Sequence, residues 1–215
     1  MPAGPWPPAD PHSLDPAIVT LRARTVLFRV HPDCLGATEF NPGLGAGGRF
    51  HFIVDEAGHS IPALYAAQTH AAALSETVFH DVPIRPKEDR RVGRRKLEGR
   101  MLSEIQTRRG IRLVELHHPG LGRLNLEPRE ITDTDPSEYE RTRAWSQALH
   151  DAGGPAGLVW ISRLHNTDKG YTFFGDRVSS DAFEATSDPL PLWLGPGLNL
   201  VYELAEAAGI TIVHG

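Results

Sequence analysis

The chain has 215 residues, a mass of 23.6 kDa, 40% hydrophobic and 23% charged residues, and a formal net charge of −5. These ordinary globular values exclude a wholly disordered, collagen-like or coiled-coil chain, and the negative charge argues against direct nucleic-acid binding. The sequence has no apolar run of the roughly 18 residues that a membrane span needs, and no signal-peptide pattern. Cys34 is the single cysteine, which excludes an intrachain disulfide. We therefore expect a cytoplasmic protein of one domain, without a membrane span.

The first part of the chain predicts an arm followed by strands around a glycine-rich loop. Residues 1–16 contain six prolines and little apolar periodicity, so we interpret them as an extended arm or mobile tail and assign the folded domain to residues 17–215. Alternating apolar residues predict a strand over 25–31, with Arg29 in its middle. After it, the patterns predict a loop over 41–48, strands over 49–56 and 61–67, and an alanine-rich helix over 69–80.

The second part of the chain opens on a basic segment, residues 85–100, with eight basic and three acidic residues, which leaves −10 on the rest. We interpret it as a solvated loop and helix start, with an anion-binding or partner-binding patch as the alternative. The patterns then predict a helix over 97–109, a strand over 111–116, a helix over 135–152, strands over 157–164 and 171–176, a helix over 199–208 and a strand over 210–213. This irregular order favours an α+β fold of mixed or antiparallel sheets with packed helices.

Three familiar site patterns are poorly matched. Gly43, Gly45 and Gly48 have the spacing of a dinucleotide-binding fingerprint, but a strand pattern follows where that fingerprint needs a helix. The eleven histidines include no His-Glu-x-x-His motif, so we expect no metal site. Ser162 lacks the glycine-flanked turn of an α/β-hydrolase nucleophile, which leaves a serine hydrolase unsupported.

Glu76 is the individual residue that most suggests chemistry. It shares a helix face with Ala72, Ala73 and His80, and a carboxylate behind small alanines can approach a ligand closely. Taken alone, such a carboxylate is more often a solvated helix charge. The same holds for the other candidates, since a lone tyrosine is usually core and a lone arginine usually a surface ion.

Five residues in order resemble the RES-domain family, which is named for its Arg, Glu and Ser. They are Arg29 in LFRVH, Arg49 in GAGGRF, Tyr65 in ALYAA, Glu76 in ALSETVFH and Ser162 in GLVWISR. The similarity extends over residues 25 to 180, and residues 48 to 80 carry most of its specificity. The chain departs from the family pattern at Phe50, where a Trp commonly follows the second Arg, and at Trp160 and Ile161, which replace a Tyr-Pro-like approach to the Ser.

The resemblance implies an ADP-ribosyltransferase-like fold and an enzyme that consumes NAD⁺ as a glycohydrolase or phosphorylase. It also implies a toxin of a toxin–antitoxin pair, with a cognate Xre-type antitoxin as its partner. NAD⁺ is then a substrate and not a cofactor, and inorganic phosphate is a possible co-substrate. Two alternatives stay open: a protein ADP-ribosyltransferase that uses the same site, and a non-catalytic domain that binds a partner protein.

The implied active site consists of Arg29, Arg49, Tyr65, Glu76 and Ser162, and each residue type suits NAD⁺ chemistry. Guanidinium groups hold phosphate oxygens through paired hydrogen bonds, so Arg29 and Arg49 are assigned to the pyrophosphate. Glu76 is assigned to the positive charge that develops on the ribose. Tyr65 can stack on nicotinamide, and Ser162 can fix the ribose or the amide. Glu76, Ser162 and Arg49 are the residues expected to take part in catalysis.

Overall fold

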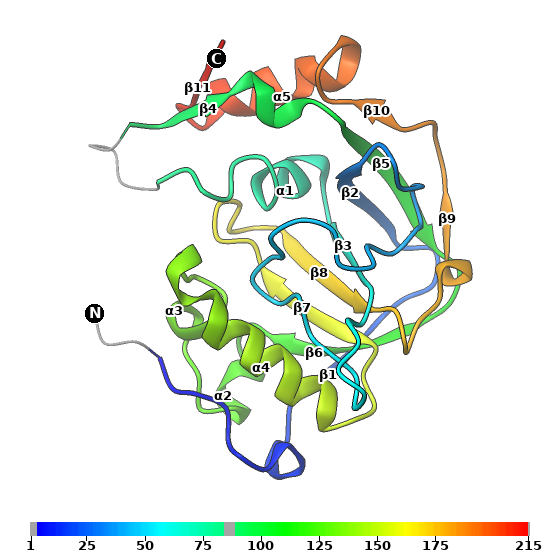
Figure 1. Ribbon diagram of the computed structural model, residues 1–215, viewed down its shortest axis with the longest axis vertical. Coiled ribbons are helices and arrows are strands. Elements are labelled where there is room, and N and C mark those ends of the chain that lie inside the picture. Colours follow the sequence, from blue (N-terminus) through cyan, green and yellow to red (C-terminus); the bar gives the residue numbers. More distant parts are fainter. Residues whose placement is uncertain (1–3, 84–88, 215) are drawn as a thin grey trace.

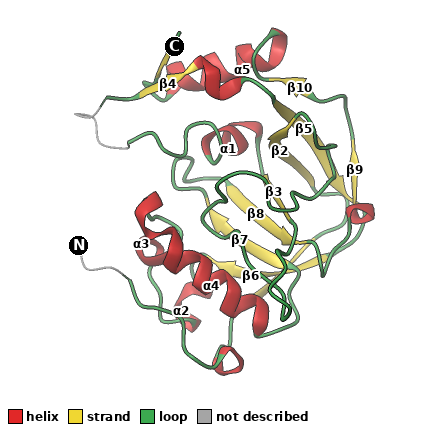
Figure 2. Ribbon diagram, in the orientation of Figure 1, coloured by secondary structure: helices red, strands yellow, loops and turns green. Residues whose placement is uncertain are grey.

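The computed structural model describes residues 4–83 and 89–214, and within these ranges the chain forms one large sheet with its α-helices packed on one face (Figures 1 and 2). The sheet order is β1 (Ile18–Leu21), β6 (Ile111–Leu116), β7 (Gly157–Ile161), β8 (Lys169–Phe174), β3 (Ala63–Ala67), β2 (Val26–Pro32), β5 (Arg100–Thr107) and β10 (Leu190–Pro191), with β9 (Phe183–Ala185) also paired to β5. Its pairs are antiparallel except β6 with β7. The α+β prediction is confirmed.

Two helices, α4 (Tyr139–Asp151) and α5 (Gly195–Ala207), have thirteen residues each, and the other helices are short. These are α1 (His70–Ser75), α2 (Gly120–Arg123) and α3 (Pro128–Ile131), and 3₁₀ turns cover Pro11–Ser13, Arg94–Leu97, Pro136–Glu138 and Ser180–Ala182. A small parallel pair joins β4 (Arg91–Gly93) to β11 (Thr211–Val213) near α5 (Figure 1). None of the helices in the described ranges is long and apolar enough to cross a membrane.

Three apolar clusters hold the layers together. On one face of the sheet, Trp145 and Leu149 of α4 pack against Leu158 and Trp160 of β7. A second cluster joins α1 and α5 to the β2–β5 part of the sheet, and a third covers the opposite face around Leu64 and other buried residues. Because α4 connects β6 to the parallel strand β7, the helix that covers this face is fixed at both ends by the sheet.

Most of the predicted strands are confirmed, and β2 keeps its predicted alternation. Its more deeply buried face is the one that carries Leu27, Arg29 and His31, with 0, 3 and 3% exposure. The helix predicted to start at Asp135 is also confirmed: a 3₁₀ turn leads into α4, and Gly153 and Gly154 follow it with positive φ. Two helix ends differ from prediction, since α1 stops at Ser75 and α5 begins at Gly195.

Two predicted elements are wrong. The helix predicted over 97–109 is the strand β5, which pairs with β2 over seven residues and with β9 and β10 on its other edge. Its buried positions Ser103, Ile105 and Thr107 alternate, so cross-strand pairing overrides the helical propensity of its Arg, Met, Leu and Glu residues. The strand predicted over 49–56 makes only isolated bridges, Gly48 with His51 and Val54 with Ser60.

The proline-rich arm lies against the protein over the part that is described, residues 4–16. The Trp145 indole N–H donates to the Pro5 carbonyl at 2.8 Å, and Leu14 packs on the core beneath α4. The arm is extended apart from one 3₁₀ turn, and these contacts hold it against α4. Of the basic segment, residues 85–88 lie outside the described residues, and the rest forms β4, the turn Arg94–Leu97 and the start of β5.

Strands β7 and β8 approach each other closely at Gly157, and a substitution there tests this contact. A Cβ at this position of β7 would lie 2.0 Å from the Thr172 carbonyl oxygen on β8. We expect Gly157→Ala to lower the free energy of unfolding by at least about 2 kcal/mol, because the two backbones must separate. The control is Gly122→Ala in α2, where a Cβ meets nothing within 4 Å, and which should be neutral or slightly stabilising. Urea denaturation measures both, and equal midpoints would contradict the contact.

Candidate functional site

Glu76 lies at the C-terminal end of α1 and is the centre of a compact polar cluster. Its side chain is only 16% exposed. The Ser162 hydroxyl donates to Glu76 Oε1 at 2.6 Å, and Arg49 Nη1 lies 3.6 Å from Oε2, so both carboxylate oxygens have a partner. Such charge-assisted contacts fix the orientation of a carboxylate that a short helix would otherwise leave free to rotate.

The position of Ser162 follows from the turn that joins β7 to β8. Ser162 is fully buried directly after β7, and its backbone N–H donates to the Asp168 carbonyl at 2.8 Å. Thr69, the N-cap of α1, accepts from the Ala72 N–H and donates its own hydroxyl to Asp168 Oδ2 at 2.5 Å. One residue, Asp168, therefore connects the helix of Glu76 to the turn of Ser162.

Arg49 reaches Glu76 from a segment that lies outside the main sheet and is held by side chains of α4. The Thr142 hydroxyl donates to the Arg49 carbonyl at 2.6 Å, and the Ser146 hydroxyl to the Phe50 carbonyl at 2.9 Å. Arg143 donates to the carbonyls of residues 46 and 48 at 3.0 and 2.9 Å. Residues 46–54 follow an irregular path, although a strand was predicted from residue 49 onward, and their backbone is satisfied by side chains of α4 instead of a ladder.

The guanidinium of Arg49 is buried and incompletely paired. Its side chain is 7% exposed, and its Nε has no hydrogen-bond partner among the described residues. Tyr139, at the start of α4, places its half-buried ring 5.9 Å from the guanidinium carbons of both Arg49 and Arg143, within cation–π range. A buried arginine with spare donors is suited to an anionic group.

Tyr65 completes the cluster from β3. Its hydroxyl accepts from the Phe50 N–H at 3.1 Å, and its half-buried ring meets Trp160 edge to face at 6.1 Å between centroids. Burial raises the pKa of the Tyr65 phenol far above its ordinary value, so the hydroxyl stays neutral. A Cβ at Gly48 would lie 3.3 Å from this hydroxyl, which explains the glycine next to Arg49.

Arg29 lies away from the other four predicted residues. The pairing of Phe28 with Ala67 puts Phe28 and Tyr65 on one face of the sheet, and Arg29 therefore points to the other. There its Nη1 donates to the carbonyls of residues 37 and 39 at 3.0 and 2.8 Å. Burial lowers its pKa to about 10, which still leaves it charged at neutral pH.

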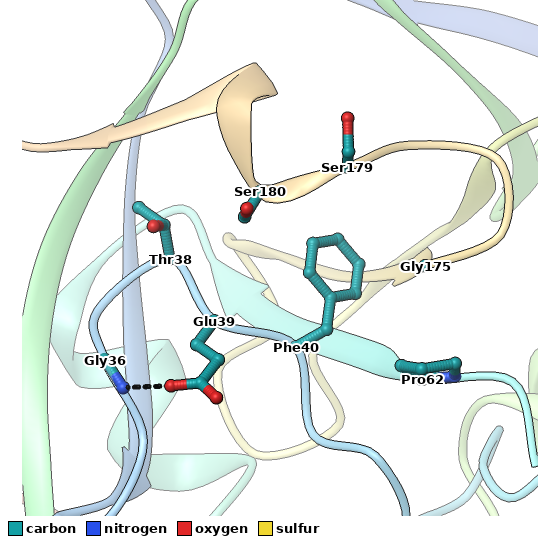
Figure 3. Close-up of a pocket in the computed structure, with 8 residues that line it drawn as sticks. All are labelled: Gly36, Thr38, Glu39, Phe40, Pro62, Gly175, Ser179 and Ser180. Atoms are coloured by element: carbon teal, nitrogen blue, oxygen red, sulfur yellow. Dashed lines mark hydrogen bonds between the residues drawn. The ribbon is translucent and has the colours of Figure 1, made fainter.

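The loop that Arg29 braces lines an open hollow of about 550 Å³ (Figure 3). Its walls are Gly36, Thr38, Glu39, Phe40, Pro62, Gly175, Ser179 and Ser180. The one carboxylate in it, Glu39, already accepts from the Gly36 N–H at 2.9 Å. None of the four clustered residues lines this hollow.

Sequence reasoning did not identify Tyr139, Thr142, Arg143 or Arg163 as part of this region. Arg163 is 10% exposed and donates to the His80 carbonyl at 3.0 Å and to Asp135 at 3.1 Å, which ties the segment after α1 to the turn before α4. The one feature of the sequence that pointed to Arg163 is its position directly after Ser162, a predicted site residue. In the described ranges, no three His, Cys, Asp or Glu side chains gather as ligands for a metal ion.

Comparison with known proteins identifies the family. The model of the RES domain matches residues 26–194, and the chain therefore belongs to the RES-domain family. Several solved chains share the fold. One is from the crystal structure of the Mycobacterium tuberculosis MbcT–MbcA toxin–antitoxin complex, with a TM-score of 0.61 and 17% identity over 87% of this chain and 92% of that one. No curated protein matches the sequence.

Tyr65→Phe tests the link between β3 and the segment of Arg49. Loss of the hydroxyl leaves the Phe50 N–H without its acceptor, and we expect the free energy of unfolding to fall by about 1–3 kcal/mol. Tyr202→Phe on the outer side of α5, where the tyrosine is 38% exposed, is the matched control and should change stability little. Thermal and urea denaturation of both variants provide the measurement, and equal losses would argue against the bond.

Proposed function

We propose that this protein cleaves the bond between nicotinamide and ribose in NAD⁺. The observation that supports the proposal is the fixed carboxylate of Glu76, held by the Ser162 hydroxyl at 2.6 Å and faced by the Arg49 guanidinium at 3.6 Å. A carboxylate of fixed orientation next to an anion-binding arginine matches the two needs of this substrate, a ribose that becomes cationic and a pyrophosphate that stays anionic.

The carboxylate acts on the ribose. When the C–N bond breaks, both of its electrons leave with nicotinamide, which departs as a neutral molecule and needs no strong general acid. The ribose is left with oxocarbenium character, and Glu76 stabilises that charge electrostatically without a reorganisation cost, because Ser162 already fixes its orientation. Water then completes hydrolysis to ADP-ribose and releases a proton, whereas inorganic phosphate gives ADP-ribose 1″-phosphate.

Arg49 is the residue assigned to the pyrophosphate. Its Nε is buried and without a described partner, so a phosphate oxygen would satisfy a donor that is otherwise desolvated at a cost. Arg29 takes no part in this proposal, because its guanidinium bonds the 37–39 backbone on the other face. The Tyr65 hydroxyl is engaged with Phe50, which leaves the ring face for contact with nicotinamide.

We also propose that the protein is the toxin of a toxin–antitoxin pair, silenced by a cognate antitoxin of the Xre type. Two findings support this: membership of the RES-domain family, and a fold shared with a chain from a toxin–antitoxin complex. The direct test is growth of cells that express the chain, with the Glu76→Gln variant as the comparison. Growth arrest by both proteins would contradict a toxicity that depends on cleavage.

The proposed activity is tested with purified protein and NAD⁺, with and without phosphate, by following nicotinamide release and the ADP-ribose species formed. Release that accelerates with phosphate identifies a phosphorylase, and release that ignores phosphate identifies a glycohydrolase. Folded protein that releases no nicotinamide in either buffer would contradict the proposal and favour a protein ADP-ribosyltransferase or a partner-binding domain.

Glu76→Gln should lower kcat at least about 100-fold while NAD⁺ still binds, because the amide keeps the shape and loses the charge. Since Arg49 then lacks its carboxylate partner, circular dichroism must show that the variant is folded. Glu203→Gln on the exposed side of α5 is the control and should keep wild-type turnover. Equal kcat values for Glu76→Gln and wild type would remove Glu76 from the mechanism.

Arg49→Ala should act first on binding. Loss of a charge-assisted contact to phosphate predicts a rise in KM of about 10- to 100-fold, larger than the fall in kcat. Arg49→Lys restores the charge but not the two-pronged geometry, and we expect it to recover only part of the affinity. Steady-state kinetics separate the two constants, and an unchanged KM in Arg49→Ala would exclude the assigned role.

A further inference from the structure

A smaller cavity of about 210 Å³ lies on the side of α1 that faces α5, and none of Glu76, Ser162, Arg49 and Tyr65 lines it. Figure 1 shows α1 between α5 and the sheet end where β7 and β8 join. Most of the wall is apolar and comes from Phe79, Val82, Leu164, Leu204 and Ile210. The wall that α5 and Ile210 provide lies beyond residues 26–194, the part matched by the family model.

The size and lining of this cavity define what it can hold. An apolar cavity of about 150 Å³ inside a protein is enough to bind benzene. At about 210 Å³, this one has room for a single aromatic ring with one small substituent. The aromatic side chain of Phe79 and the branched side chains around it favour a ring over a flexible chain of the same volume.

One end of the cavity is positively charged. Arg90 lines it, and its guanidinium donates from Nε to the Pro83 carbonyl at 3.0 Å and from Nη1 to the Ala208 carbonyl at 2.6 Å. These two bonds hold the group in place and use neutral carbonyl acceptors, and no ion pair of Arg90 is formed within the described ranges 4–83 and 89–214. Among the described residues that line the cavity, none is acidic. A carboxylate on the ligand would supply the missing charge.

The cavity also touches both segments that carry the polar cluster. Ser75 lines it and directly precedes Glu76, while Leu164 and His165 follow Ser162 in the β7–β8 turn. The His165 N–H donates to the Ser162 carbonyl at 3.3 Å. A ligand in the cavity would thus contact the two segments whose side chains meet in the Ser162–Glu76 hydrogen bond.

We propose that the cavity between α1, α5 and the β7–β8 turn binds a small aromatic carboxylate, with the ring among Phe79, Leu164 and Leu204 and the carboxylate on Arg90. This inference stands apart from the proposed function, because it rests on residues outside the polar cluster and is measured by binding in the absence of NAD⁺.

Benzoate is the probe, and isothermal titration of the full chain is the measurement. We expect saturable binding with a dissociation constant on the order of 1 mM, as expected for so small a ligand. Arg90→Gln should weaken binding at least about tenfold, and Arg90→Lys should keep most of it. The matched control is Arg91→Gln, because the neighbouring exposed Arg91 pairs with Asp89 at 2.8 Å and should not affect benzoate.

A second set of measurements separates the cavity from a surface charge effect. Ala207→Leu places a larger side chain at the cavity wall in the last turn of α5 and should abolish benzoate binding with the Arg90 charge intact. Benzoate should also shift the backbone amide NMR signals of Leu164 and His165 in the wild type. Absence of saturation, equal affinity in Arg90→Gln and wild type, or displacement of benzoate by ADP-ribose would each overturn the proposal.

Discussion

The hydrogen bonds from α4 to the backbone of residues 46–54 are the constraint on which the site depends. This segment lies outside the main sheet, yet Arg49, Phe50 and Ile53 within it are buried, so its polar groups need partners. Side chains of α4 supply them one turn after another, from Thr142 to Ser146, and Gln147 bonds both the N–H and the carbonyl of residue 54 at 2.8 and 2.9 Å. Because α4 is packed on β7 through Trp145, the sheet ultimately fixes Arg49.

The fold was predictable where a strand shows a clean alternation and where glycines end a helix. It was not predictable where partners distant in the sequence decide whether a segment becomes a helix, a strand or a loop. The β5 sequence has good helix formers, and its strand state depends on partners more than 60 residues away in β2 and β9. The 49–56 segment alternates like a strand, but the α4 side chains that satisfy its backbone are about 93 residues distant in sequence. Neither partner is visible in a local pattern.

The sequence indicated which residue types form the candidate site, but it only partly indicated which of them lie together in space. Four of the five residues that the family resemblance indicated meet at one point, whereas Arg29 faces the other side of the sheet. Both faces of β2 are covered, so alternation alone did not tell which one the cluster occupies. Tyr139 had no signal at all, because a tyrosine in the first turn of a helix is common and its importance here comes from two arginines that it meets in space.

The long separations in sequence within the cluster also govern when it forms. The Ser162–Glu76 hydrogen bond joins residues 86 positions apart in the sequence, and the Thr142–Arg49 bond joins residues 93 positions apart. Neither bond can form while the chain is still short. During synthesis, Glu76 and Arg49 leave the ribosome well before α4 and the β7–β8 turn exist. The nascent protein therefore carries both side chains unassembled while the 86 residues from Glu76 to Ser162 are made. The hydrogen-bonded arrangement of Glu76 forms only when about three quarters of the chain has been made.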